Sequence, residues 1–145
     1  MTSKKINQKI KRPEPVLPMD LKQKLYEASV QNPEADIYFL NKQFKRLRGR
    51  KPLTLREDFG GTGLLAHEWV RQGPQHKAWA IDLDAPTLEY GRKVHTPKLT
   101  AAQKKRLALL EGNVLDSYSF RPDITVAFNF SYFIFKRRQD LLAYF

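Results

Sequence analysis

The chain has 145 residues, a formal net charge of +11 and no cysteine. With 41% hydrophobic residues, this length is enough for one domain with a core. The lack of cysteine excludes a disulfide framework and a cysteine-ligated zinc site, and no apolar stretch is long enough to cross a membrane. The basic amino terminus lacks the apolar segment of a secretory signal, so we expect a cytoplasmic protein.

The positive charge is concentrated at the amino-terminal end. Residues 1–51 contain 13 Lys and Arg against five acids, whereas residues 52–145 contain 13 against ten. Residues 1–18 combine lysines with three prolines and few apolar groups, which predicts a disordered basic tail. Such a tail can bind the phosphates of a nucleic acid, although most basic tails are simply solvated.

Residues 19–51 are predicted to form an amino-terminal helical segment. The first helix is expected to begin at Asp20, which would cap it, and to bury Leu21, Leu25 and Ala28 before it ends near Pro33. The second helix is expected to start at Pro33 and to end before Gly49.

Residues 52–145 follow an alternating strand and helix pattern. Strands are predicted at 53–58, 78–83, 107–112 and 123–130, and helices at 64–71, 86–94, 101–106 and from 138 onward. This order predicts the α/β class: a Rossmann-like three-layer sandwich with a mainly parallel sheet. The sheet would be incomplete, because the chain stops as the helix after the fourth strand begins.

A glycine-rich loop follows the first predicted strand. Glu57 and Asp58 precede Phe59, and Gly60, Gly61 and Gly63 then lead directly into a helix. Glycines let the backbone turn sharply and approach a ligand, and the helix start offers free amide donors. A ligand-free connection remains the alternative.

Two acids end the second predicted strand, nineteen residues after Gly63. Asp82 has the position and spacing of a carboxylate that accepts hydrogen bonds from the ribose hydroxyls of an adenosine. Asp84 is better explained as a turn residue before Pro86.

The three histidines, His67, His76 and His95, share no spacing typical of metal ligands, and we predict no metal site.

These residues resemble the class I S-adenosylmethionine (SAM)-dependent methyltransferases over about residues 53–145. Residues 55–63 are similar to the acid and Gly-x-Gly-x-Gly loop of the first family motif, and Asp82 is similar to the ribose-binding acid of the second. The stretch from the first helix to Gly63 also resembles a bacterial branch of methyltransferase-domain proteins. The resemblance implies that SAM is the cofactor and that the methyl acceptor is unidentified.

The resemblance assigns further cofactor contacts. Asn113 and Val114, after the third strand, would lie where the family contacts the adenine, although Asn113 could equally be a turn residue. Asn129 would lie near the sulfonium at the end of the fourth strand. The full set of implied cofactor-binding residues is Glu57, Gly60, Gly61, Gly63, Asp82, Asn113, Val114 and Asn129.

Two departures from the family pattern matter. Phe59 stands where the family usually has its first glycine, so Glu57 is the ligand-facing acid in one alignment and Asp58 in a shifted one. Residues 129–132, Asn-Phe-Ser-Tyr, match the Asn-Pro-Pro-Tyr signature of amino-group methyltransferases only at their ends. No catalytic residue is predicted, since methyl transfer mainly requires that donor and acceptor be held together.

The resemblance to half of a methyltransferase implies that this chain is mainly the donor-binding part. We expect low or no activity from it alone. The exposed strand edges of a shortened sheet favour either a homodimer or instability. Two other functions stay open. Residues 61–66 fit the Gly-x-Gly-x-x-Ala pattern of NAD(P)-binding oxidoreductases, and the basic tail fits a non-catalytic nucleic-acid-binding module.

Overall fold

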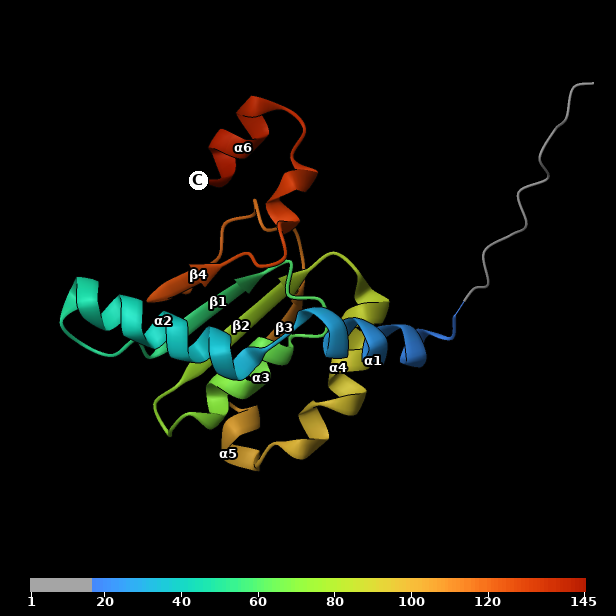
Figure 1. The fold of residues 1–145 in the computed structure, drawn as a ribbon, viewed down its shortest axis with the longest axis horizontal. Helices are drawn as coiled ribbons and strands as arrows, with labels where there is room; N and C mark the ends of the chain where they lie inside the picture. Colours follow the sequence, from blue (N-terminus) through green and yellow to red (C-terminus); the bar gives the residue numbers. More distant parts are fainter. Residues whose placement is uncertain (1–16) are drawn as a thin grey trace, which may run out of the picture.

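The structure, a computed structural model, describes residues 17–145 (Figure 1). The predicted basic tail, residues 1–18, lies outside the described residues except for Leu17 and Pro18. None of the helices in the described part of the chain is long and apolar enough to span a bilayer.

Four parallel strands form the sheet. They are β1 (Thr54–Asp58), β2 (Lys77–Asp82), β3 (Leu107–Glu111) and β4 (Ile124–Val126), in the spatial order β3-β2-β1-β4. Because β1 and β2 are adjacent and the later strands lie on opposite sides of them, the strand order reverses at β1. This is the predicted Rossmann-like α/β architecture, and the carboxyl ends of the strands meet at one edge.

Helices follow the strands as predicted. They are α3 (Leu64–Arg71), α4 (Ala85–Val94), the short α5 (Ala101–Lys104) and α6 (Arg138–Tyr144), with two 3₁₀ turns, η1 (Thr96–Lys98) and η2 (Ser131–Ile134). Helix α3 packs on β1 and β2. Its Trp69 is fully buried, and the indole Nε1 donates a hydrogen bond to the Leu53 carbonyl at 3.2 Å.

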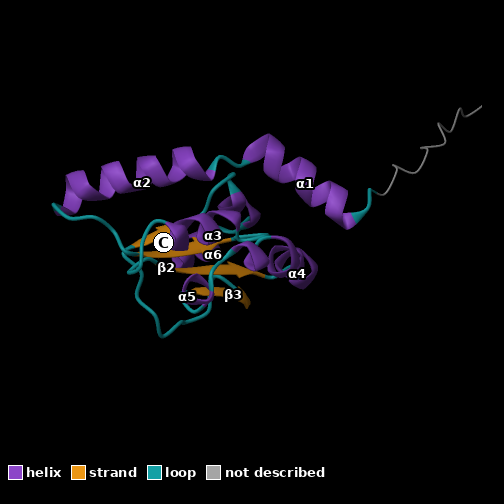
Figure 2. Ribbon diagram, turned by 90° about the horizontal axis from the view of Figure 1, so that it is seen from below, coloured by secondary structure: helices purple, strands orange, loops and turns teal. Residues whose placement is uncertain are grey.

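Two helices precede the sheet, as the sequence predicts. Helix α2 (Pro33–Arg48) has Asn32 as its cap, Pro33 in its first turn and left-handed Gly49 after its end. It buries Ile37 and Leu40 against the core and packs on α3, so it forms an outer layer above the sheet (Figure 2).

Helix α1 (Met19–Val30) differs from the prediction in its cap and its buried face. Pro18, not Asp20, occupies the cap position, and no side chain caps the helix. Leu21 and Leu25 are 43% and 49% exposed, while Gln23 is the buried residue of this helix. The reason is that α1 packs against polar side chains of α4 and of the loop after β1, Thr87, His95 and Thr62, so its inner face is polar.

Strand β4 is much shorter than the predicted strand 123–130. Only Ile124–Val126 pair with β1. Asn129 and Phe130 have φ of +56° and +57°, which turns the backbone out of the extended conformation and into η2. Apolar composition alone therefore overestimated the strand, because the turn at 129–130 carries no glycine or proline to mark it.

Candidate functional site

The loop between β1 and α3 is a sharp turn with three left-handed residues. Phe59, Gly61 and Gly63 have φ of +55°, +56° and +68°. Gly60 has little room, because an added Cβ would lie 2.9 Å from Cβ of Ala80 and 3.3 Å from the Glu57 carbonyl. The loop therefore accommodates Phe59 in place of a glycine by adopting a conformation that side chains rarely take.

The carboxylate of Asp82 lies directly against this loop. Its Oδ2 accepts a hydrogen bond from the amide of Gly61 at 2.7 Å, and its Oδ1 accepts one from the amide of Asp84 at 2.8 Å. A carboxylate has about four acceptor positions, so two stay available for a ligand. The two sequence motifs thus form one unit, as the ribose-binding hypothesis requires.

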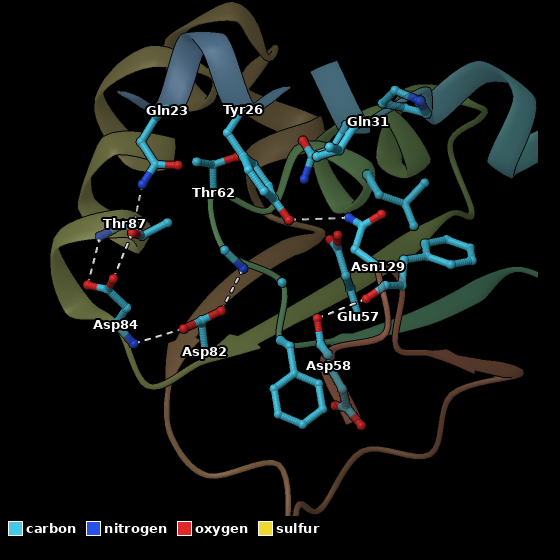
Figure 3. A pocket seen from close by; sticks show the side chains of 18 of the residues that line it. Gln23, Tyr26, Gln31, Glu57, Asp58, Thr62, Asp82, Asp84, Thr87 and Asn129 are labelled. Carbon is cyan, nitrogen blue, oxygen red and sulfur yellow. Dashed lines mark hydrogen bonds between the residues drawn. The ribbon is translucent and has the colours of Figure 1, made fainter. Parts of the chain in front are cut away.

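A cavity of about 580 Å³ opens at the carboxyl ends of the strands. This volume lies within the range typical of small-molecule sites. Five of the predicted cofactor contacts line it: Glu57, Gly60, Gly61, Asp82 and Asn129. Figure 3 labels three of them, Glu57, Asp82 and Asn129.

Three other predicted contacts do not line this cavity. Gly63 caps α3, and a Cβ there would lie 2.6 Å from Cδ2 of Leu109, which is a packing constraint. The Asn113 Oδ1 accepts from the amide of Leu115 at 2.9 Å, the geometry of a turn asparagine. The Val114 side chain is buried, and its carbonyl accepts a hydrogen bond from Arg56.

The structure distinguishes the two acids of the loop. Both line the cavity, but both Asp58 oxygens are hydrogen-bonded, one to the Arg56 guanidinium at 2.6 Å and one to the Tyr144 hydroxyl at 2.9 Å. Glu57 uses only Oε2, which accepts from the amide of Ala66 at 3.0 Å in the first turn of α3. Its Oε1 has no hydrogen-bond partner among residues 17–145.

Glu57 is 6% exposed, and burial raises its pKa to about 8. The hydrogen bond from Ala66 opposes this shift, and the charges of Asp36 and Asp82 add to it. A group with this pKa is largely protonated at neutral pH until a cation reaches it. Glu57 is therefore suited to ionise when a positively charged ligand binds.

Helix α1 forms the outer wall of the cavity. Gln23 donates a hydrogen bond to Thr87 Oγ1 of α4 at 3.0 Å, and Tyr26 accepts one from Asn129 at 3.4 Å (Figure 3). Glu27 accepts from the Thr62 hydroxyl at 2.5 Å and pairs with His95 Nε2 at 2.7 Å. These polar contacts tie α1 to the glycine loop and to α4.

Sequence reasoning missed this wall. The signal available was polar residues at helical spacing, since Gln23, Glu27 and Gln31 recur every four positions. Such a stripe usually faces water, so periodicity alone did not identify it. Asp84, predicted as a turn residue, caps α4 by accepting from the Thr87 amide at 3.3 Å and also lines the cavity.

The cavity lining is strongly acidic. Within the described part of the chain, it contains five carboxylates and a single cationic side chain, Lys22; the carboxylates are Asp36, Glu57, Asp58, Asp82 and Asp84. Burial raises the pKa of Asp36. No group of three or more potential ligands that could hold a metal ion occurs in residues 17–145. The excess of carboxylates in the lining favours a ligand that carries positive charge.

Comparisons with known proteins give structural matches only. No family model matches the chain, and no curated protein matches its sequence. The fold is similar to an amino pentose methyltransferase from Micromonospora echinaspora, solved with SAM, at a TM-score of 0.64 and 13% identity. It is also similar to a sugar N-methyltransferase from Streptoalloteichus (TM-score 0.62, 17% identity) and to the methyltransferase domain of a bacterial Hen1 protein (TM-score 0.58, 13% identity).

These matches extend over most of this chain but only part of the others. They cover 90%, 85% and 77% of this chain and 50%, 45% and 55% of the respective solved structures. The chain thus spans about half the length of the proteins that it matches. Within that span, it has the Rossmann-like fold of SAM-dependent methyltransferases.

Proposed function

We propose that this chain binds S-adenosylmethionine and supplies the donor-binding part of a methyltransferase. The observation that carries the proposal is the contact between the Asp82 carboxylate and the Gly61 amide on the wall of one cavity. The similar folds of proteins whose names describe methyltransferases support the same class.

The residues present fit the donor. Asp82 would accept hydrogen bonds from the two ribose hydroxyls through its two remaining acceptor positions. Glu57, with a free Oε1, would accept from the ammonium of the methionine part. Gly60 and Gly61 both line the cavity, so their backbone would be accessible to the ligand.

When bound, SAM supplies an electrophilic methyl group on a sulfonium. The protein's contribution is to orient the donor, exclude water and neutralise charge, and these tasks need no nucleophile from the chain. Helix α1 would shield the donor from solvent, because it forms the outer wall of the cavity. The methyl acceptor is unidentified, and a cytoplasmic location is predicted from the sequence.

An NAD(P)-binding oxidoreductase is the alternative that uses the same loop. Among the described residues that line the cavity, Lys22 is the only cation against five carboxylates, so little in the lining would balance the negative charge of a pyrophosphate. The acidic lining is thus better matched to SAM, whose net charge is positive.

Isothermal titration calorimetry with S-adenosylhomocysteine and with NAD separates the two functions. We expect binding of S-adenosylhomocysteine and none of NAD, and exclusive binding of NAD would overturn the proposal.

Methyl transfer to a panel of amines, sugars and RNA would then be compared between this chain and a carboxyl-extended one. We expect turnover to be much higher in the extended chain, and equal turnover would contradict the donor-half assignment.

A further inference from the structure

A second cavity, of about 400 Å³, lies at the opposite edge of the sheet. Its lining comes from α2, from the link between α2 and β1, and from the turn between α3 and β2: Tyr38, Asn41, Lys42, Lys45, Lys51, Gln72 and His76. Lys51 precedes β1 and His76 precedes β2, so this cavity lies at the amino ends of the strands. The first cavity, which contains Glu57 and Asp82 and which we propose binds SAM, lies at their carboxyl ends.

The two cavities have opposite charge. Among residues 17–145, three lysines and no acid line the second one, whereas five carboxylates and one lysine line the first. Lys42, Lys45 and Lys51 are exposed, and none of them forms a salt bridge with an acid of residues 17–145. Burial lowers the pKa of His76, and the nearby Arg106 lowers it further, so the lysines provide the charge. Three uncompensated cations around one hollow favour a polyanion.

An aromatic face accompanies the lysines. Tyr38 is 69% exposed, and its ring centroid lies 5.8 Å from the Lys42 ammonium. Tyr38, Lys42 and Lys45 are spaced by four and three residues on α2, so they share one face of that helix. Asn41 and Gln72 add amide groups that can donate to phosphate oxygens or to base edges.

We propose that this second cavity binds single-stranded nucleic acid, with backbone phosphates on the lysines and a base stacked on Tyr38. A basic groove beside an exposed aromatic ring is the usual construction of such sites. A small anion would need only the charges, whereas the exposed tyrosine next to them supplies the stacking surface for a base. The site shares no lining residue with the first cavity, which we propose binds SAM.

The test measures binding of the full chain to a fluorescent single-stranded RNA of about 12 nucleotides by anisotropy over a range of salt. The variant is Lys42→Gln/Lys45→Gln/Lys51→Gln. Its matched control is Lys24→Gln/Lys93→Gln/Lys136→Gln, which removes the same charge from exposed positions on α1, α4 and the link before α6. Circular dichroism establishes that both variants fold.

We expect the cavity variant to bind the RNA more weakly. The slope of log affinity against log salt should also become shallower by about 2, because each of the three lysines that neutralises a phosphate on a single strand contributes about 0.7. The control should keep nearly the full slope. Equal losses in the two variants would mean that only net charge matters, and this would overturn the proposal.

Tyr38 tests the stacking component and separates nucleic acid from free phosphate. Tyr38→Leu should weaken RNA binding by about fivefold or more, whereas Phe39→Leu, at a 55% exposed position that does not line the cavity, should leave it unchanged. Inorganic phosphate should compete only at concentrations far above those of the RNA. An unaffected Tyr38→Leu variant, or phosphate competing as well as RNA, would contradict a nucleic-acid site.

Discussion

The carboxylate of Asp82 accepts a hydrogen bond from the amide of Gly61 at 2.7 Å across 21 residues of sequence. Strands β1 and β2 are parallel neighbours, so their carboxyl ends place the glycine loop and the acid side by side. Because the second carboxylate oxygen accepts from the Asp84 amide, the carboxylate is held in one orientation before any ligand arrives. Preorganisation of this kind lowers the entropic cost of binding.

Replacement of Asp82 tests the site directly. Asp82→Asn removes the charge and one acceptor oxygen, so the affinity for S-adenosylhomocysteine should fall by about tenfold or more, the value of one charged hydrogen bond. Titration calorimetry measures the loss. Asp116→Asn, an exposed acid outside the cavity, is the control and should bind normally. An Asp82→Asn variant that binds with unchanged affinity would remove this residue from the ligand site.

Glu57 should make folding stability depend on pH. Its pKa is raised from an ordinary value of 4.5 to about 8, so the folded state binds its proton more tightly than the unfolded state. The stabilisation from this proton is full below pH 4.5 and is lost as the pH rises through about 8. Glu57→Gln keeps the acceptor for the Ala66 amide but has no proton to lose. Between pH 5 and pH 8, the free energy of unfolding should therefore fall by roughly 2 to 4 kcal/mol more in the original protein than in Glu57→Gln. Urea unfolding at both pH values measures this difference, and parallel pH profiles of the two proteins would contradict it.

The same group should link ligand binding to proton release. If Glu57 receives the ligand ammonium, it must ionise on binding, so affinity for S-adenosylhomocysteine should rise by up to about tenfold per pH unit below pH 8. Calorimetry in buffers with different ionisation enthalpies counts the protons released. Glu57→Gln should bind more weakly and release fewer protons, and an identical proton count in the variant would assign the ionisation to another group.

Glu27 should hold α1 in place over the cavity. Burial would raise the pKa of Glu27, but hydrogen bonds from His95 and Thr62 outweigh it and hold the pKa below its ordinary value. Its contribution is therefore present above pH 4.5 and is lost as the pH falls through the lowered folded-state value. Glu27→Gln should increase amide hydrogen exchange in α1 by about tenfold, while Glu34→Gln, at an exposed position in α2, serves as the control. Unchanged exchange in Glu27→Gln would show that α1 is held by other contacts.

Gly91 on α4 should control the position of the glycine loop. A Cβ at this position would overlap the Thr62 carbonyl, and neither backbone can move without shifting the loop. We expect Gly91→Ala to destabilise the protein by about 1 to 3 kcal/mol and to weaken S-adenosylhomocysteine binding. Thermal unfolding and calorimetry test the two effects. Gly49→Ala introduces strain at a left-handed residue with open space around it, so it should lower stability without changing affinity.

Much of the fold could be predicted from the sequence because its signals are local. The apolar spacing of α3 and the cap residues of α2, Asn32 and Gly49, act within a few residues and mark these helices closely. The order of strands and helices then restricts the sheet to a parallel arrangement. Two local signals failed, at Asp20, which does not cap α1, and at Asn129, where a left-handed turn has no glycine.

For the site, the sequence by itself predicted which residues could contact an adenosine-type ligand; of these, Gly60, Gly61 and Asp82 line the cavity, whereas Gly63 caps α3. Only the tertiary structure decided that Glu57 keeps a free oxygen while both Asp58 oxygens are occupied. It also decided that the polar stripe of α1 faces the cavity and that three lysines surround a second one. The physical reason is that turn chemistry and apolar spacing act between neighbours in the chain. Thr62 and His95 reach Glu27, Tyr144 reaches Asp58 and Gly61 reaches Asp82 only when the elements pack.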